Sequence, residues 1–186
     1  FARISDGFQI DFEKLRQTID ADPCVRLVFL TSPNNPTGDL ISREQLKGVL
    51  AACEDKALVV MDEAYIEFCD AGSAAELVSR WPQLVVLRTL SKAWAAAGVR
   101  CGAVIANPAV IDLLQRVMAP YPLTAPAVDA ALRAVSGDAI GRQRKLVTMV
   151  RQGKADLLEF LLQRDWISDV WPGEANFILA RVADAD

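Results

Sequence analysis

The chain is organised around the run LVVLRTLSKAW, which occupies positions 84–94. Its first four residues are leucine and valine, a composition typical of a buried strand. Two hydroxyl residues, Thr89 and Ser91, then lead to Lys92, and the alanine-rich, helix-favouring run 93–97 follows. Open α/β sheets bind their ligands at the carboxyl ends of their strands. The run therefore predicts a strand that presents hydroxyl groups and a lysine to a ligand.

Strand-sized apolar runs alternate with helical patterns on both sides of this run. Strands are predicted at residues 25–30, 57–61, 84–87 and 101–106, and helices at residues 11–19, 42–54, 74–80, 107–118, 125–135 and 137–164. This alternation is typical of an α/β fold with a mostly parallel sheet. The last part changes to a long helix and two paired strands, 169–171 and 177–180, around a Pro-Gly turn. We expect part of a large α/β domain at residues 1–136, and a linking helix and the incomplete start of a smaller α+β domain at residues 137–186.

The composition excludes several classes of function. The formal net charge is −4 and no run of basic residues is present, so we expect no nucleic-acid partner. The longest apolar runs are only strand-sized, so we expect no membrane partner. Histidine is absent, which excludes Ser-His and Cys-His nucleophiles and most zinc sites, and we expect no metal. Four cysteines in apolar surroundings are predicted to be buried free thiols, which suits a cytoplasmic protein: Cys24, Cys53, Cys69 and Cys101.

Two further stretches place polar residues directly after predicted strands. The run SPNNPTG at residues 32–38 is a rigid loop, either a simple strand-to-helix turn or a loop whose asparagines donate to a ligand oxygen. Asp62 ends the second strand, where it either caps the next turn or pairs with a cationic ring nitrogen. A buried carboxylate is costly unless it is paired, which favours the second role. Tyr65, three residues further on, is within reach of the same ligand.

Lys92 and Arg100 each allow a plain and a specific interpretation. Lys92 is either an exposed residue at the start of a helix or a nucleophilic amine that forms a Schiff base. The hydroxyls before it, together with the helix start, predict an adjacent anion site. Arg100 lies between Gly98 and Gly102, and is either part of a surface salt bridge or a clamp for a phosphate group.

In chain order, the runs SPNNPTG, DEAY, TLSKA and GVRCG resemble the fold-type I pyridoxal-phosphate enzymes. The resemblance covers essentially the whole chain. Four longer runs are similar to the histidinol-phosphate aminotransferases of that group: DEAYIEF at 62–68, RTLSKA at 88–93, APYPL at 119–123 and NFILAR at 176–181. The resemblance implies the large-domain fold of these enzymes and a covalently bound pyridoxal 5′-phosphate.

The resemblance also implies roles for individual residues. Lys92 would be catalytic: it carries the cofactor as a Schiff base and moves a proton between the substrate and the cofactor. Asp62 would pair with the pyridinium nitrogen and keep the ring an electron sink. Tyr65 and Asn35 would hydrogen-bond the phenolic oxygen of the ring. Three side chains would bind the phosphate: Thr89, Ser91 and Arg100.

The implied reaction is reversible transfer of an amino group between L-histidinol phosphate and 2-oxoglutarate, a step of histidine biosynthesis. The implied assembly is a homodimer. Members of the family are longer and carry further phosphate-binding and substrate-binding groups at both ends, so the resemblance implies that this chain is a fragment without turnover of its own. The alternatives are another enzyme of the same fold, such as an amino-acid-phosphate decarboxylase or an aromatic aminotransferase, or a truncated fragment that has no catalytic role.

Overall fold

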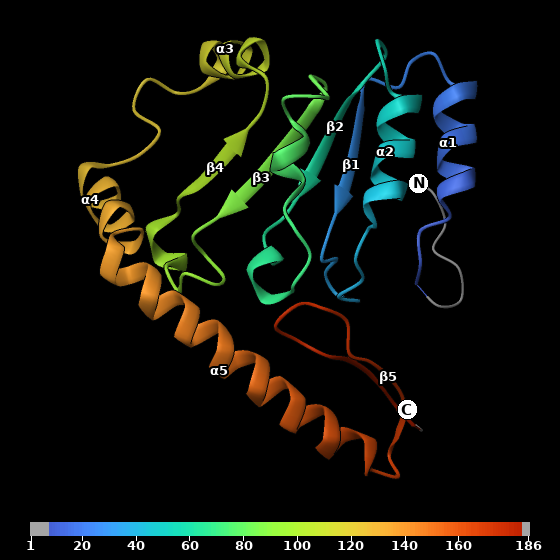
Figure 1. Ribbon diagram of the computed structural model, residues 1–186, viewed down its shortest axis with the longest axis vertical. Coiled ribbons are helices and arrows are strands. Elements are labelled where there is room, and N and C mark those ends of the chain that lie inside the picture. The colour runs from blue at the N-terminus through green and yellow to red at the C-terminus, as the bar shows by residue number, and fades with distance from the viewer. Residues whose placement is uncertain (1–7, 184–186) are drawn as a thin grey trace.

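The computed structural model describes residues 8–183, so the outermost parts of the two expected domains, residues 1–7 and 184–186, lie outside this range. A central sheet contains four strands: β1 (Leu27–Thr31), β2 (Leu58–Asp62), β3 (Leu84–Thr89) and β4 (Gly102–Ile105). They lie side by side in the order β1-β2-β3-β4, and the first three are parallel (Figure 1). The expected α/β class with a mostly parallel sheet is confirmed.

The fourth strand differs from its three neighbours because β4 runs antiparallel to β3. A parallel return needs a long crossover, which is usually a helix. Here the connection contains only a turn and the short 3₁₀ helix η3 (Ala97–Val99). The expected helix start after Lys92 is therefore wrong. Ala95 adopts φ of 51°, a left-handed conformation that is incompatible with a continuous right-handed helix.

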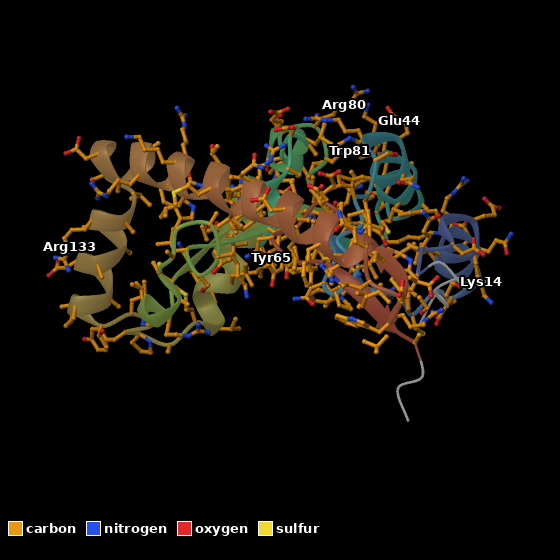
Figure 2. The ribbon with its side chains drawn as sticks, turned by 90° about the horizontal axis from the view of Figure 1, so that it is seen from below. Lys14, Glu44, Tyr65, Arg80, Trp81 and Arg133 are labelled. Carbon is orange, nitrogen blue, oxygen red and sulfur yellow. The ribbon has the colours of Figure 1, made fainter. Side chains whose placement is uncertain are left out.

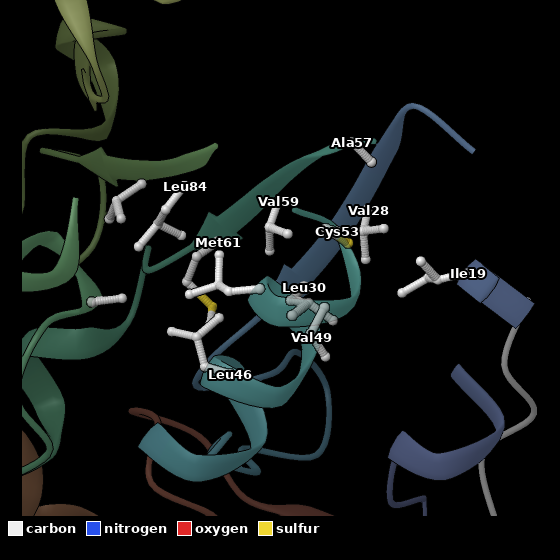
Figure 3. Packing of buried hydrophobic residues seen from close by; sticks show 13 residues of the cluster. Ile19, Val28, Leu30, Leu46, Val49, Cys53, Ala57, Val59, Met61 and Leu84 are labelled. Atoms are coloured by element: carbon white, nitrogen blue, oxygen red, sulfur yellow. The ribbon is translucent and has the colours of Figure 1, made fainter. Parts of the chain in front are cut away.

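Helix α2 (Arg43–Ala52) packs its buried side chains against one face of the sheet. Helix α1 (Phe12–Ala21) lies beside α2 (Figure 1). Helix α2 begins with a capping box, in which Ser42 and Gln45 exchange side-chain and backbone hydrogen bonds. Figure 3 shows Leu46 and Val49 of α2 packed among strand residues. These residues belong to one buried cluster whose other members include Val28, Leu30, Val59, Met61, Leu84 and Val86. The two-residue alternation of β1 thus places Val28 and Leu30 in this core.

The connection from β2 to β3 contains two short 3₁₀ helices, η1 (Ile66–Phe68) and η2 (Ala74–Leu77). The helix predicted at residues 74–80 is therefore shorter and more tightly wound than expected. The start of η2 is fixed by Glu63, whose carboxylate accepts from the backbone N–H of Ala74 at 2.6 Å and from Ser73 Oγ. Glu63 is thereby buried with its charge satisfied by hydrogen bonds.

The remaining elements lie close to their predicted positions, except that the last strand begins two residues later than predicted. They are α3 (Pro108–Val117), α4 (Ala125–Ala134), α5 (Gly137–Leu162), β5 (Ile167–Trp171) and β6 (Leu179–Val182). Strands β5 and β6 form an antiparallel pair. In Figure 1, α5 and this pair lie beyond the carboxyl ends of β1, β2 and β3. The second part of the chain therefore faces the edge of the sheet at which ligand sites are expected.

The cysteines follow the sequence prediction only in part. All four are free thiols, and Cys53 and Cys69 are buried as expected. Burial raises the pKa of both thiols, which keeps them protonated. The predicted burial is wrong for Cys24, which is exposed in the connection between α1 and β1, and for Cys101, which is only partly buried. Between residues 8 and 183, no helix is long and apolar enough to cross a membrane.

Candidate active site

The predicted site residues gather at the carboxyl edge of the sheet. Asp62 is the last residue of β2 and Thr89 is the last residue of β3. Asn35 lies in the loop that follows β1, and the strand register places Thr31 beside Asp62. Because β1, β2 and β3 are parallel, their three ends meet at one edge. The sheet topology thus explains how residues so far apart in the sequence converge.

A compact group forms around the Tyr65 ring. Asn35 Nδ2 donates to the Tyr65 hydroxyl oxygen at 3.0 Å. Lys92 Nζ lies 5.1 Å from the centroid of the same ring, and Phe177 meets that ring edge-on with the centroids 5.2 Å apart. Tyr65 is only 7% exposed and belongs to a buried cluster with Val147 of α5. Figure 2 shows Tyr65 near the ribbon of α5. Asn35, Tyr65 and Lys92 are therefore brought together as predicted.

The predicted phosphate-binding residues are only partly joined. Thr89 Oγ1 donates to Ser91 Oγ at 2.9 Å and accepts from the backbone N–H of Ser91 at 3.1 Å. Arg100 follows η3 with φ of 55°, and its guanidinium donates to the carbonyl of Ala97 at 3.1 Å. Within residues 8–183 it makes no salt bridge, so the surface-pair interpretation is not realised. Gly102, two residues later, pairs with Thr89, which places Arg100 at the same edge of the sheet as the hydroxyls.

Asp62 takes the capping role that was one of its two predicted roles. Its Oδ1 accepts from the backbone N–H of Ala64 at 2.9 Å. Its other oxygen, Oδ2, accepts no hydrogen bond from any described residue. A carboxylate oxygen that is partly sheltered from water and has no partner can accept from a cationic nitrogen. The cap and the ligand-binding role therefore use different oxygens and do not exclude one another.

A contact between two distant loops completes the edge of the site. The backbone N–H of Glu174, in the loop between β5 and β6, donates to the carbonyl of Gly38 at 2.7 Å. Gly38 and Gly173 both have positive φ, and a Cβ on either would lie within 2.7 Å of the other's backbone. Only glycine permits this approach. The SPNNPTG loop and the loop at residues 172–178 thereby form one continuous wall.

Lys154 of α5 anchors this wall and was not predicted from the sequence. Its Nζ donates to the carbonyl of Gly173 at 2.8 Å and to that of Ala175 at 2.7 Å. Burial lowers the pKa of Lys154, because it weakens the hydration of the ammonium group. Ala175 belongs to the buried cluster that contains Tyr65. Lys154 therefore connects α5 to the site through the backbone of Gly173 and Ala175. The sequence around Lys154 is mostly polar, so the helical pattern alone does not predict that this lysine binds backbone carbonyls.

The side chains present are a set of complementary groups for a phosphorylated pyridine aldehyde. A lysine amine can bind an aldehyde covalently, and an aspartate can pair with a ring nitrogen. An amide and a phenol can bind a ring oxygen, and two adjacent hydroxyls with a nearby arginine can bind a phosphate. No group of three potential metal ligands occurs among the described residues. The residues thus fit a pyridoxal phosphate group in chemical type, and all lie at one sheet edge.

Comparisons with known proteins identify relatives in both sequence and fold. Residues 1–186 match the family model described as "Aminotransferase class I and II". The histidinol-phosphate aminotransferase of Pectobacterium atrosepticum is 43% identical over 180 residues, which cover 97% of this chain and 50% of that protein. The crystal structure of the histidinol-phosphate aminotransferase from Clostridium acetobutylicum has a TM-score of 0.85 at 26% identity, and the match covers 99% of this chain and 55% of that one.

One enzyme with a different activity has the same fold. It is the L-threonine-O-3-phosphate decarboxylase from Porphyromonas gingivalis, with a TM-score of 0.74 at 24% identity, which covers 86% of this chain and 48% of that one. The chain spans about half the length of the curated relatives that it matches.

Proposed function

Because this chain belongs to the class I and II aminotransferase family, we propose that it holds pyridoxal 5′-phosphate on Lys92 and serves amino-group transfer. The family is pyridoxal-phosphate-dependent. One observation carries the proposal: the Lys92 amine lies 5.1 Å from the centroid of a tyrosine ring whose hydroxyl oxygen accepts from Asn35. Lys92 itself is exposed at the sheet edge, so an incoming aldehyde can reach it.

The remaining residues would hold the cofactor by its polar groups. Asp62 would accept from the protonated ring nitrogen, and Asn35 and Tyr65 would hydrogen-bond the phenolic oxygen. The phosphate would be bound by three side chains: Thr89, Ser91 and Arg100. When bound, the cofactor supplies an electron sink for bonds at the α-carbon of the substrate.

Each residue then has a separate task in the transfer. The negative charge of Asp62 would favour the protonated form of a ring nitrogen bound beside it, because an opposite charge close by favours the charged form. The Lys92 amine would act as the general acid and base that transfers a proton at the substrate α-carbon. Tyr65 and Phe177 pack edge-to-face and form an apolar side of the site that limits the access of water.

We propose L-histidinol phosphate as the amino-group donor and 2-oxoglutarate as the acceptor. The similarity to histidinol-phosphate aminotransferases in both sequence and fold supports this pair. The shared fold of a phosphoamino-acid decarboxylase supports the second candidate, a decarboxylase of the same fold, less strongly because that match shows the fold alone.

The substrate proposal is tested in the natural protein that contains this chain. We expect glutamate to form from 2-oxoglutarate with L-histidinol phosphate as the donor. Aromatic amino acids and L-threonine O-3-phosphate are the comparison substrates. Faster transfer from an aromatic amino acid, or release of carbon dioxide from the phosphoamino acid, would contradict the proposal.

The assembly and organisation of the chain are also proposals. We propose a homodimer, because α3 and α4 have no buried residue and expose apolar side chains such as Leu113, Val117 and Leu132. We propose that residues 1–136 belong to the cofactor-binding domain, and that residues 137–186 link it to a smaller domain. The free thiols suit a reducing cytoplasm. A monomer by light scattering would contradict the first of these proposals.

A further inference from the structure

The turn that carries Lys92 is not held by an α-helix. Its backbone bonds are the N–H of Leu90 to the carbonyl of Cys101 at 3.1 Å, that of Ala95 to Lys92 at 3.0 Å, and that of Ala96 to Leu90 at 3.0 Å. The first of these bonds ties the turn to the start of β4, and the other two close it on itself. The position of the amine therefore depends on side chains that fasten the turn to the rest of the fold.

One carboxylate oxygen contacts both sides of this turn. Glu67 Oε1, from η1, accepts from Arg88 at 2.7 Å and from Trp94 Nε1 at 3.3 Å. Arg88 precedes Lys92 by four residues along β3, and Trp94 follows Lys92 by two. The Glu67 side chain is only 13% exposed, so water competes little for these charge-assisted bonds.

The guanidinium of Arg88 has a second fixed partner. Its NH1 lies 3.7 Å from Oε2 of Glu63, whose side chain is 3% exposed and is held by two further hydrogen bonds. Arg88 is thus fixed between two sheltered carboxylates. Trp94 packs against the cluster that contains Tyr65 and Ala93. Glu67 therefore connects Arg88, which is fixed at the end of β3, to Trp94, whose side chain lies close in sequence to the reactive lysine.

We propose that Glu67 is a positioning residue for Lys92: by accepting from Arg88 and Trp94 together, it holds the turn in the form that directs the amine at the cofactor carbonyl. This inference rests on the proposed function. If Glu67 served stability alone, it would form the same hydrogen bonds, but replacing it would leave the capture of an aldehyde by Lys92 unchanged in molecules that remain folded. The two roles differ in what happens at Lys92 when the global fold is kept.

The test compares Glu67→Leu, Glu67→Gln and Trp94→Phe with Glu76→Leu as the matched control. Glu76 pairs with Arg43 at the same distance of 2.7 Å, but this pair lies on the exposed surface, between α2 and η2. Each variant is titrated with pyridoxal 5′-phosphate well below its melting temperature, reduced with borohydride and mapped. In the cofactor-free chains, hydrogen exchange of the Ala95 and Ala96 amides reports the turn directly.

We expect Glu67→Leu to weaken capture at Lys92 by about tenfold, which corresponds to about 1.4 kcal/mol. The Ala95 and Ala96 amides should exchange faster in the same variant. Glu67→Gln, which keeps an acceptor oxygen, should retain most of the capture, and Glu76→Leu should behave as the unchanged chain. If Glu67→Leu does not fold, Trp94→Phe decides, because it removes the Nε1 donor while it keeps an aromatic ring at this position, and it should weaken capture in the same direction.

Two results would overturn the inference in different ways. Capture at Lys92 that is unchanged in the folded Glu67 variants and in Trp94→Phe would show that Glu67 serves stability alone, while the proposed function stands. Absence of capture at Lys92 in the unchanged chain would contradict the proposed function itself, and the inference would fall with it.

Discussion

Replacing Lys154 by methionine tests the connection between α5 and the site wall. Methionine keeps most of the apolar stem and removes the ammonium that donates to the carbonyls of Gly173 and Ala175 at 2.8 and 2.7 Å. A hydrogen bond from a charged donor contributes about 1.5–3 kcal/mol when it is buried. Lys154 is only partly buried, and its removal also relieves the desolvation that lowers its pKa. We therefore expect a net loss of about 2 kcal/mol rather than the sum of two full bonds.

Thermal unfolding followed by circular dichroism measures this loss. For a chain of this length it corresponds to a melting temperature lower by about 4–8 °C. The matched control is Lys145→Met on the same helix, because Lys145 is exposed and should tolerate the change with little effect. Hydrogen exchange should also be faster at the Glu174 amide, which donates to Gly38. Equal melting temperatures for the two variants, with an unchanged Glu174 amide, would refute the anchoring role of Lys154.

Three further predictions concern other parts of the fold. Leu50→Ala should lower the free energy of unfolding by about 2–5 kcal/mol in denaturant titrations, because Leu50 is 0% exposed in the α2 core. Gly38→Ala should destabilise the chain by about 2 kcal/mol, because Gly38 has φ of +76° and a Cβ there would meet backbone at 2.7 Å. Gly48→Ala should instead stabilise the chain by about 0.5–1 kcal/mol, because Gly48 lies in α2 with open space around it. The hydrogen bond from Arg151 lowers the pKa of Asp70 below its ordinary 3.8. The ionised Asp70 therefore stabilises the fold above pH 3.8, and this stabilisation is lost as the pH falls through the lower pKa of the folded chain. In Asp70→Asn, this acid-dependent loss should be missing when the free energy of unfolding is measured against pH.

The sequence was sufficient to predict most of the elements, because their signals are local. Buried strands appear as short runs of valine and leucine, and the Ser42 capping box marks the start of α2 without any knowledge of the fold. The convergence of Asn35, Tyr65 and Lys92 also followed from one rule, that parallel strands place their carboxyl ends at the same edge. For these features, local pattern and topology agree.

The features that the sequence did not predict depend on contacts between distant segments. The short connection that leads to the antiparallel β4 contains Ala95 in a left-handed conformation, and nothing in an alanine-rich run indicates a positive φ. The anchoring of residues 172–178 depends on a lysine whose partners are backbone carbonyls, which no side-chain pattern reveals. Glu67, Arg88 and Trp94 lie in stretches that the sequence analysis singled out, but nothing in the sequence indicates that Glu67 accepts from the other two. Such contacts appear only once the fold is assembled.

The most direct test of the central claim is the covalent capture of pyridoxal 5′-phosphate by the chain. The chain is mixed with the cofactor, reduced with borohydride, digested and mapped by mass spectrometry. We expect one labelled residue, Lys92, and loss of the label in Lys92→Arg. A label spread over lysines such as Lys145, or no label at all, would contradict the assignment of Lys92 as the residue that holds the cofactor.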